Sequence, residues 1–342
     1  MPPVSLALKA VTNKVSLPPR RVSVAPMMDW TDRHCRYFHR QITRHTWLYT
    51  EMVTTGSVIY GDMARQLDFN REEQPVALQL GGSEPADLAT CAKLGQQWGY
   101  DEINLNCGCP SERVVLGAFG ACLMAEPKLV ADGIKAMRDA VDIDVSVKHR
   151  IGIDNVNSYS FVRDFVGTVA DAGCKIFIVH ARNAILKGLT PKENREIPPL
   201  KYDFVYQLKR DFPQLEIIIN GGIRTAEEID DHLKHLDGVM IGREAYHNPW
   251  LLAEFDERYY GDAVQSKSRM EVIQAMLPYI EAQVATGGPR MNSIVRHMLG
   301  LMSGLRGARL FRQQMSDAKV LACGDAALLL QAAKAVEAAA TC

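Results

Sequence analysis

The chain alternates short apolar, β-prone runs with longer amphipathic stretches, and this alternation restricts the folds that it can adopt. Eight such runs lie between residues 22 and 252, and helical patterns separate most of them. This order predicts an α/β protein with a (β/α)8 TIM barrel. An open doubly wound sheet fits less well, because its Gly-x-Gly-x-x-Gly after the first strand is missing. The predicted strands are Val22–Ala25, Trp47–Thr50, Val76–Leu80, Glu102–Leu105, Val145–Val147, Ile176–Val179, Ile217–Ile219 and Gly238–Ile241. The predicted helices are Pro85–Trp98, Pro127–Ala140, Ser158–Ala172, Tyr202–Asp211 and Ala226–Leu236.

Residues able to contact a ligand come at or just past the ends of these predicted strands. The carboxyl ends of all strands of a TIM barrel meet at one rim, where active sites are built. Each residue alone has a structural explanation: Lys148 as a solvated strand end, for example, or His180 as a packed core histidine. Chance placement around the whole rim is a much weaker explanation, so we interpret the set as a site. The set comprises Pro26, Met27, Met28, Glu51, Gln79, Asn106, Lys148, His180, Asn220, Gly221, Gly222, Gly242 and Arg243.

The segment Cys107-Gly108-Cys109-Pro110 after the fourth predicted strand contains two thiols, and a glycine-rich run that includes Cys122 follows it as far as Met124. The spacing lacks the two-residue gap of zinc pairs, and no second pair follows, so we expect no metal. Two interpretations remain open from the residues alone: a tight turn with buried, inert thiols, or a loop that places a reactive thiol.

The last two loops of the predicted barrel indicate a phosphorylated cofactor. Asn220-Gly221-Gly222 and Gly242-Arg243 follow the seventh and eighth strands, where TIM barrels usually bind phosphate. Ordinary barrel turns are the alternative. Lys148 and His180 are then placed to hydrogen-bond the electron-rich edge of a redox ring. Gln79 and Asn106 are placed to contact its polar side.

From residue 253 onwards the pattern is helical only. Four helices are predicted, over Ser268–Ala285, Met291–Leu301, Arg306–Met315 and Ala326–Ala340. We therefore divide the chain into an extension (1–21), a catalytic barrel (22–252) and a smaller all-α domain (253–342). The segment from Arg290 to Lys319 carries six basic residues against a single acid, Asp317. This is either a solvated face or a surface for a phosphate backbone, and Arg309 and Arg312 share one face of their helix.

Composition limits the classes of protein further. The net charge of −1 excludes a globally basic nucleic-acid binder but leaves room for a local patch. No apolar run reaches the roughly 18–20 residues of a membrane span, and the first 21 residues lack a signal-peptide pattern. Eight cysteines without a disulfide framework indicate a reducing compartment. We therefore expect a cytoplasmic protein without a membrane segment, and a monomer.

Several of these stretches together resemble the tRNA-dihydrouridine synthase family. The resemblance runs from Val24 nearly to the end of the chain, and the segment from Gly188 to Leu200 is similar to the bacterial A subfamily. The sequence departs from the family's pattern at Val115, which stands where a polar residue, typically Gln, is expected in the active-site loop. The matching stretches are Ala25–Arg33, Gln79-Leu80, Asn104–Ser111, Lys148–Arg150, His180–Arg182, Asn220–Gly222, Gly242-Arg243 and His297–Leu301.

The resemblance implies a flavoenzyme that reduces D-loop uridines of tRNA at positions 20 and 20a. It implies FMN in the barrel, NADPH as the reductant, and a helical domain that helps to hold the tRNA. Cys109 is then the general acid that protonates uracil C5, and Cys107 is a packed thiol. Asn106 and Arg182 are expected to read the uracil edge. We further expect Lys192, Arg195, Arg309 and Arg312 to position the tRNA.

Two other classes of protein stay open beside this interpretation. A barrel flavoenzyme for a small molecule, such as a dihydroorotate or enoate reductase, would not need the basic helical domain. An RNA-binding protein that has lost catalysis would retain flavin only weakly.

Overall fold

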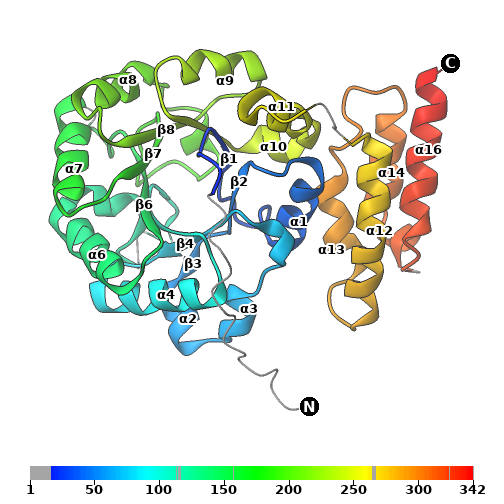
Figure 1. The fold of residues 1–342 in the computed structure, drawn as a ribbon, viewed down its shortest axis with the longest axis horizontal. Helices are drawn as coiled ribbons and strands as arrows, with labels where there is room; N and C mark the ends of the chain where they lie inside the picture. Colours follow the sequence, from blue (N-terminus) through cyan, green and yellow to red (C-terminus); the bar gives the residue numbers. More distant parts are fainter. Residues whose placement is uncertain are drawn as a thin grey trace.

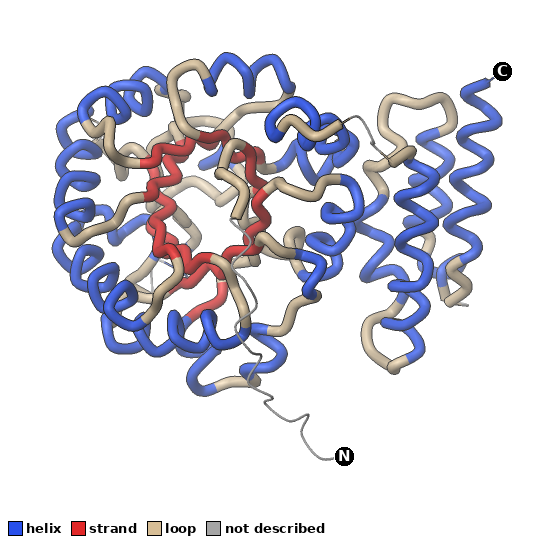
Figure 2. The backbone as a smooth tube through the Cα atoms, in the orientation of Figure 1, coloured by secondary structure: helices blue, strands red, loops and turns tan. Residues whose placement is uncertain are grey.

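Eight parallel strands close into a barrel in the computed structural model, which describes residues 17–112, 114, 117–156, 158–263, 267–322 and 324–341. Each strand pairs with its neighbour in the chain, and the ring closes where β1 pairs with β9 (Figure 2). The TIM-barrel prediction is therefore confirmed. Val115 lies outside the described residues. The barrel strands are β1 (Val22–Val24), β2 (Trp47–Tyr49), β4 (Val76–Gly81), β5 (Glu102–Cys107), β6 (Asp144–Arg150), β7 (Ile176–His180), β8 (Glu216–Asn220) and β9 (Gly238–Ile241).

All eight predicted strands occur within one to three residues of their expected ends. A ninth, β3 (Val53–Thr54), adds two residues beside β4 and was not predicted, because so short a run has no readable period. Helices cover the outside of the ring (Figures 1 and 2). They are α1 (Arg33–Ile42), α2 (Thr55–Tyr60), α3 (Met63–Leu67), α4 (Pro85–Trp98), α6 (Pro127–Ala140), α7 (Tyr159–Asp171), α8 (Tyr202–Asp211), α9 (Ala226–Leu233), α10 (Arg243–His247) and α11 (Phe255–Tyr260).

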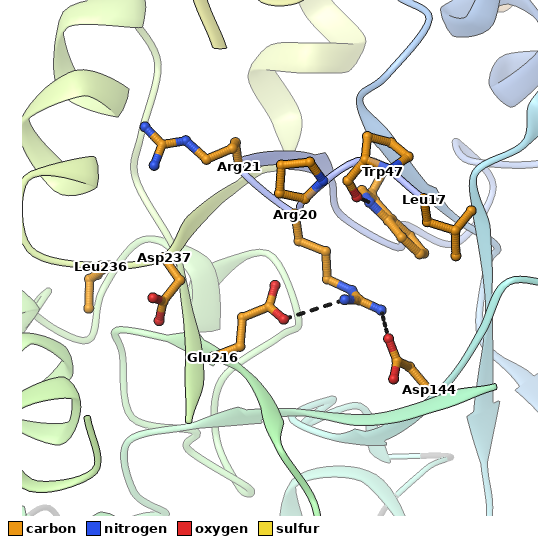
Figure 3. A pocket seen from close by; sticks show the side chains of 10 residues that line it. Leu17, Arg20, Arg21, Trp47, Asp144, Glu216, Leu236 and Asp237 are labelled. Carbon is orange, nitrogen blue, oxygen red and sulfur yellow. Dashed lines mark hydrogen bonds and ion pairs between the residues drawn. The ribbon is translucent and has the colours of Figure 1, made fainter. Parts of the chain in front are cut away.

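Apolar side chains, with a few buried polar ones among them, fill the amino-terminal half of the barrel interior, and Arg20 closes its end. Inward-facing side chains such as Trp47, Tyr49 and Ile178 are fully buried. Arg20 lies over the Trp47 ring and forms ion pairs with Glu102, which is fully buried, and with two more exposed acids, Asp144 and Glu216. Figure 3 shows the last two of these pairs at the edge of a cavity of about 480 Å³. This cavity lies at the end of the barrel opposite the rim where the site is predicted.

The described chain after α11 contains helices without strands. These helices form a layer beside the barrel, next to α1 (Figure 1). The helices of this part are α12 (Arg269–Ala285), α13 (Met291–Val295), α14 (Ala308–Ser316), α15 (Ala318–Leu321) and α16 (Ala327–Thr341). The four predicted helices are confirmed, except that the one from Met291 changes to a 3-10 turn at Arg296. The short α15 was not predicted. No helix in the described ranges is long and apolar enough to cross a membrane.

Aromatic stacking and one acidic residue join this helical layer to the barrel. Tyr279 of α12 stacks on Tyr37 of α1, with 3.9 Å between the ring centroids. Asp32, which caps the first turn of α1, also accepts hydrogen bonds from Arg296 and His297, each at 3.0 Å. Asp32 directly follows the loop after β1, so a single carboxylate links the barrel rim to the helical layer.

Candidate active site

The predicted rim residues lie at the carboxyl end of the barrel, but several stand on the strands rather than after them. Asn106 is in β5 and Lys148 in β6, and the two are paired in register. His180 and Asn220 are the last residues of β7 and β8 and are also paired. Gln79 lies within β4. Because ladder hydrogen bonds hold both sides of such positions, these side chains start from a rigid backbone.

Asn106 holds the turn that carries Cys109. Its Oδ1 accepts hydrogen bonds from the backbone N–H of Gly108 at 3.0 Å and of Cys109 at 2.9 Å. Its Nδ2 donates to Oε1 of Gln79 at 2.8 Å. An amide side chain has two N–H groups, so Asn106 keeps one donor beyond these contacts. The residue predicted to read a substrate therefore also positions the thiol loop.

The two thiols of this loop have different surroundings. Cys107 is fully buried, and burial raises the pKa of its thiol far above the ordinary value. Cys109 is partly exposed and contacts the hydroxyl of Ser111, with 3.4 Å between Sγ and Oγ. Its carbonyl accepts from the N–H of Ala121 at 2.9 Å, which closes the loop. Of Cys107 and Cys109, only Cys109 is thus exposed to a ligand at the rim.

Gly120 is required where this loop closes. Its backbone has a φ of +74°, in the left-handed region. A Cβ at this position would lie only 2.6 Å from the carbonyl oxygen of Cys109. Any other residue would push the Cys109 backbone out of place.

Lys148 is a cation at the rim without an acidic partner among the described residues. Its Nζ donates to Oδ1 of Asn220 at 3.1 Å. Burial, and then the neighbouring charge of Arg150, lowers its pKa to about 7. An anion bound beside Nζ would stabilise the charged ammonium. This environment fits the electron-rich edge of a redox ring or another anionic group.

Further cations surround Lys148. Burial and then Arg150 lower the pKa of His180 well below its ordinary value, so its ring is neutral near pH 7. Arg182 and Arg195 act on His180 in the same direction. Among the arginines at this rim, Arg150, Arg182 and Arg195 form no ion pair with a described residue. Arg243 pairs with Glu196, with 2.6 Å between the nitrogen and the oxygen. The rim therefore has an excess of positive charge that an anionic ligand would neutralise.

The glycines after β8 and β9 provide unused backbone donors. Gly221 and Gly222 have φ values of +119° and +81°, which other residues rarely adopt. The N–H groups of Gly221, Gly222 and Gly242 form no hydrogen bond with any described residue. Orphaned N–H groups at one edge, beside arginines, fit a phosphate.

The N-terminus of α9 is not free to bind a phosphate together with these N–H groups. Thr225 caps the helix, and the carboxylate of Glu228 accepts from the N–H groups of Arg224 and Thr225. This helix end therefore already has its own anion.

The loop after β1 approaches the same edge. A Cβ on Gly242 would lie 3.8 Å from Sδ of Met27, so the loops after β1 and β9 are adjacent. Met28 points outward and is 56% exposed, whereas Pro26 is half-buried. The structure thus brings Met27 next to the predicted phosphate loops, with Met28 directed to solvent.

The predicted substrate residues fall into two groups. Arg182 donates to the carbonyls of Glu196 and Pro198, and Lys192 and Arg195 are exposed on the same loop after β7. Arg309 and Arg312 are exposed on α14, in the helical layer, and form no ion pair with described residues. The structure therefore places the first group at the rim and the second outside it.

One basic residue of the helical segment already has a partner on the barrel. Arg296 was counted among the six basic residues between Arg290 and Lys319, but its guanidinium pairs with Asp32. It therefore helps to fix the helical layer on the barrel. A distance of 264 positions separates the two residues, so no local pattern could have revealed the pair.

Arg150 is the main site residue that the sequence did not single out. Its guanidinium is buried and donates to the carbonyls of Gly108, Asn183 and Asn194, at 2.8–2.9 Å. It thereby ties the thiol loop to the loop after β7. The available signal was the alternation of Ser146, Lys148 and Arg150, which directs all three into the barrel. The described residues contain no group of three or more His, Cys, Asp or Glu that could hold a metal ion.

Comparisons with known proteins show the family of this chain. A solved structure of 2-naphthoyl-CoA reductase in complex with 2-naphthoyl-CoA has the same fold, with a TM-score of 0.54 and 10% identity, over 69% of this chain and 50% of that one. The tRNA-dihydrouridine(20/20a) synthase of Pseudomonas putida is 60% identical over 87% of this chain and 89% of its own length. That of Salmonella typhi is 57% identical over 95% and 98%. A family model described as "Dihydrouridine synthase (Dus)" matches residues 23–339. The chain therefore belongs to the dihydrouridine synthase family.

Proposed function

We propose that this protein is an FMN-dependent tRNA-dihydrouridine(20/20a) synthase that uses NADPH. The observation that carries the proposal is a partly exposed thiol, Cys109, held at the rim of a TIM barrel beside Lys148 and Arg150, which form no ion pair with a described residue. The relatives named above, at 57–60% identity over most of their length, support the substrate and the uridine positions. A tRNA substrate is consistent with a cytoplasmic protein, and we expect it to act as a monomer.

The rim residues fit FMN. The free N–H groups of Gly221, Gly222 and Gly242 suit its phosphate, together with Arg243. Lys148, His180 and Gln79 suit the polar edge of its ring. Bound FMN, once reduced by NADPH, would supply the hydride for C6 of the uracil.

Cys109 would donate the proton that completes the reduction. When hydride reaches C6, negative charge develops at C5, and a thiol on the opposite face can neutralise it by proton transfer from Sγ. The remaining N–H of Asn106 and the guanidinium of Arg182 would bind the carbonyl edge of the base. The uridine must leave the tRNA stack to reach them.

The basic residues outside the rim would position the tRNA. Lys192 and Arg195 on the loop after β7, and Arg309 and Arg312 on α14, are exposed and suited to phosphate contacts. Such contacts set the orientation of the substrate, and the folded shape of the tRNA then selects the uridine.

Mass spectrometry of tRNA tests the proposed function directly. Purified protein, FMN and NADPH are incubated with tRNA that lacks dihydrouridine, and the digested tRNA is searched for a mass gain of two hydrogens at positions 20 and 20a. Absence of this product would overturn the proposal. A yellow protein that oxidises NADPH without modifying tRNA would indicate a small-molecule reductase, and a colourless protein that binds tRNA would indicate an RNA-binding protein without catalysis.

Lys148 predicts a specific pH dependence of FMN binding. An anion beside Nζ raises the pKa of Lys148 from about 7, so binding takes up a proton above that pH. FMN affinity should therefore fall as pH rises through about 7, by up to about tenfold per unit. Fluorescence titration of flavin-free protein between pH 6 and 9 measures this fall. Lys148→Met should bind FMN more weakly and lose this part of the dependence; identical pH curves for the two proteins would remove Lys148 from the site.

Arg309 and Arg312 predict a change in the salt dependence of tRNA binding. Replacing both with Ala should weaken binding and reduce the slope of log affinity against log salt by about 1.5–2, because two phosphate contacts are lost. Flavin content and NADPH oxidation should not change. Arg71→Ala with Arg210→Ala is a matched control, because both are exposed and adjoin the amino-terminal ends of barrel strands. Superimposable salt curves for the α14 variant and the control would exclude α14 from the tRNA surface.

A further inference from the structure

Five polar side chains occupy the barrel interior at positions where apolar residues would normally pack. Glu102, Asn104 and Asn106 alternate along β5, and Gln79 and Ser146 face them from β4 and β6. All five are at least 92% buried. Buried polar groups cost free energy unless each finds a partner, so their partners decide what they do.

These side chains form one continuous line of hydrogen bonds from the barrel floor to the thiol loop. Ser146 donates to Glu102, and Asn104 donates through Nδ2 to Oγ of Ser146 at 2.7 Å. Gln79 donates through Nε2 to Oδ1 of Asn104 at 2.7 Å, and Asn106 donates to Gln79. At the carboxyl-terminal end of the barrel, Oδ1 of Asn106 accepts hydrogen bonds from the N–H groups of Gly108 and Cys109.

Both ends of the line impose the same direction on it. Ionised Glu102 can only accept, and its other oxygen is held by Arg20 at 2.7 Å, so Ser146 must donate to it. Ser146 therefore accepts from Asn104, and each amide in turn has one permitted orientation. The backbone N–H groups at the top can only donate, so Asn106 must present Oδ1 to them. None of the three amides can turn over without breaking at least two hydrogen bonds.

We propose that Ser146 and Asn104 are positioning residues that transmit the polarity of Glu102 through Gln79 and Asn106, and so fix the Cys109 loop and present N–H donors to the ligand. The link to a flavin and a uracil rests on the proposed function. The positioning of Cys109 itself does not, because it follows from hydrogen bonds within the chain. Hydrogen bonds in such a line polarise one another, and loss of one link frees the amides above it.

Ser146→Ala tests this inference, because it removes one link and leaves the contacts of Glu102 with Arg20 and Tyr49 in place. Ser23→Ala is the matched control: Ser23 is also fully buried in the barrel, and its hydroxyl has no hydrogen-bond partner among the described residues. The first measurement is the alkylation rate of Cys109 by iodoacetamide in flavin-free protein, followed by peptide mass spectrometry. Loss of a hydrogen bond of about 1 kcal/mol should raise this rate about fivefold in Ser146→Ala.

Two further measurements separate positioning from a general loss of stability. FMN should bind Ser146→Ala about fivefold more weakly, and single-turnover formation of dihydrouridine should slow with the tRNA affinity unchanged. Ser23→Ala should match the wild type in all three. Glu102→Gln, which can donate as well as accept, should change Cys109 alkylation in the same direction, and it decides the question if Ser146→Ala does not fold.

Equal alkylation rates in wild type, Ser146→Ala and Ser23→Ala would overturn the inference. Equal increases in both serine variants would also overturn it, because they would indicate a nonspecific loosening of the barrel. If the wild type forms no dihydrouridine, the proposed function fails, whereas the alkylation comparison still tests the line of hydrogen bonds.

Discussion

Cys109→Ala is expected to form dihydrouridine about 10²–10⁴ times more slowly than the wild type, while still binding FMN and oxidising NADPH. This range is what a positioned general acid contributes. Cys109 is partly exposed at the rim, and its backbone is held by Asn106 and Ala121, so the thiol is presented to a bound base. Flavin reduction precedes the lost proton transfer and should proceed normally. Stopped-flow absorbance measures the first half-reaction, and mass spectrometry of tRNA measures the second.

Cys107→Ala is the control for this result. Its thiol is fully buried in the apolar core, so the variant should lose some stability and keep its rate of dihydrouridine formation within a few-fold of the wild type. If the Cys107 variant instead lost product formation while the Cys109 variant retained it, the roles assigned to the two thiols would be wrong.

Arg20→Met should destabilise the protein by about 3–5 kcal/mol. Removing the guanidinium leaves Glu102 as a fully buried charge without its cation, which costs far more than loss of an exposed ion pair. The pairs with Asp144 and Glu216 add less, because those carboxylates are partly solvated (Figure 3). Thermal unfolding should show a decrease in midpoint of roughly 4–7 °C.

Arg21→Met provides the comparison, because Arg21 is the next residue and forms no ion pair with a described residue. A double variant, Arg20→Met with Glu102→Gln, should recover part of the lost stability, since the unpaired charge is then absent. Equal midpoints for Arg20→Met and Arg21→Met would show that the buried pair does not hold the barrel floor.

The fold and the location of the site could be predicted because they depend on local patterns. Apolar runs of β-branched and aromatic residues such as Ile176–Val179 are typical of buried strands, and helices such as Pro127–Ala140 begin with a proline at a favoured position. In a parallel barrel the polarity of each strand then places all carboxyl ends at one rim. Lys148, His180 and Asn220 could therefore be assigned to one site without knowledge of their contacts.

The roles of individual side chains were less predictable, because each depends on partners from other strands. Arg150 looked like part of a matching stretch, yet it joins two loops through carbonyls 33–44 positions away. Arg296 belongs to the basic segment between Arg290 and Lys319, yet it pairs with Asp32 at the barrel. Composition and spacing identify a charge, but packing decides whether the charge faces solvent or another residue.

The sequence by itself therefore determined the closed barrel, the helical layer and the edge of the barrel where the candidate site is expected, since the residue patterns of strands and helices and their order along the chain are local properties. Only the tertiary structure decided which thiol is exposed, which arginine holds the barrel floor and how the amides of Gln79 and Asn106 are oriented. Those outcomes depend on burial and on hydrogen bonds between residues 25–82 positions apart, such as Gln79 with Asn104 and Arg20 with Glu102. A buried polar group must be satisfied wherever the folded chain brings it, and that place does not exist until the barrel closes.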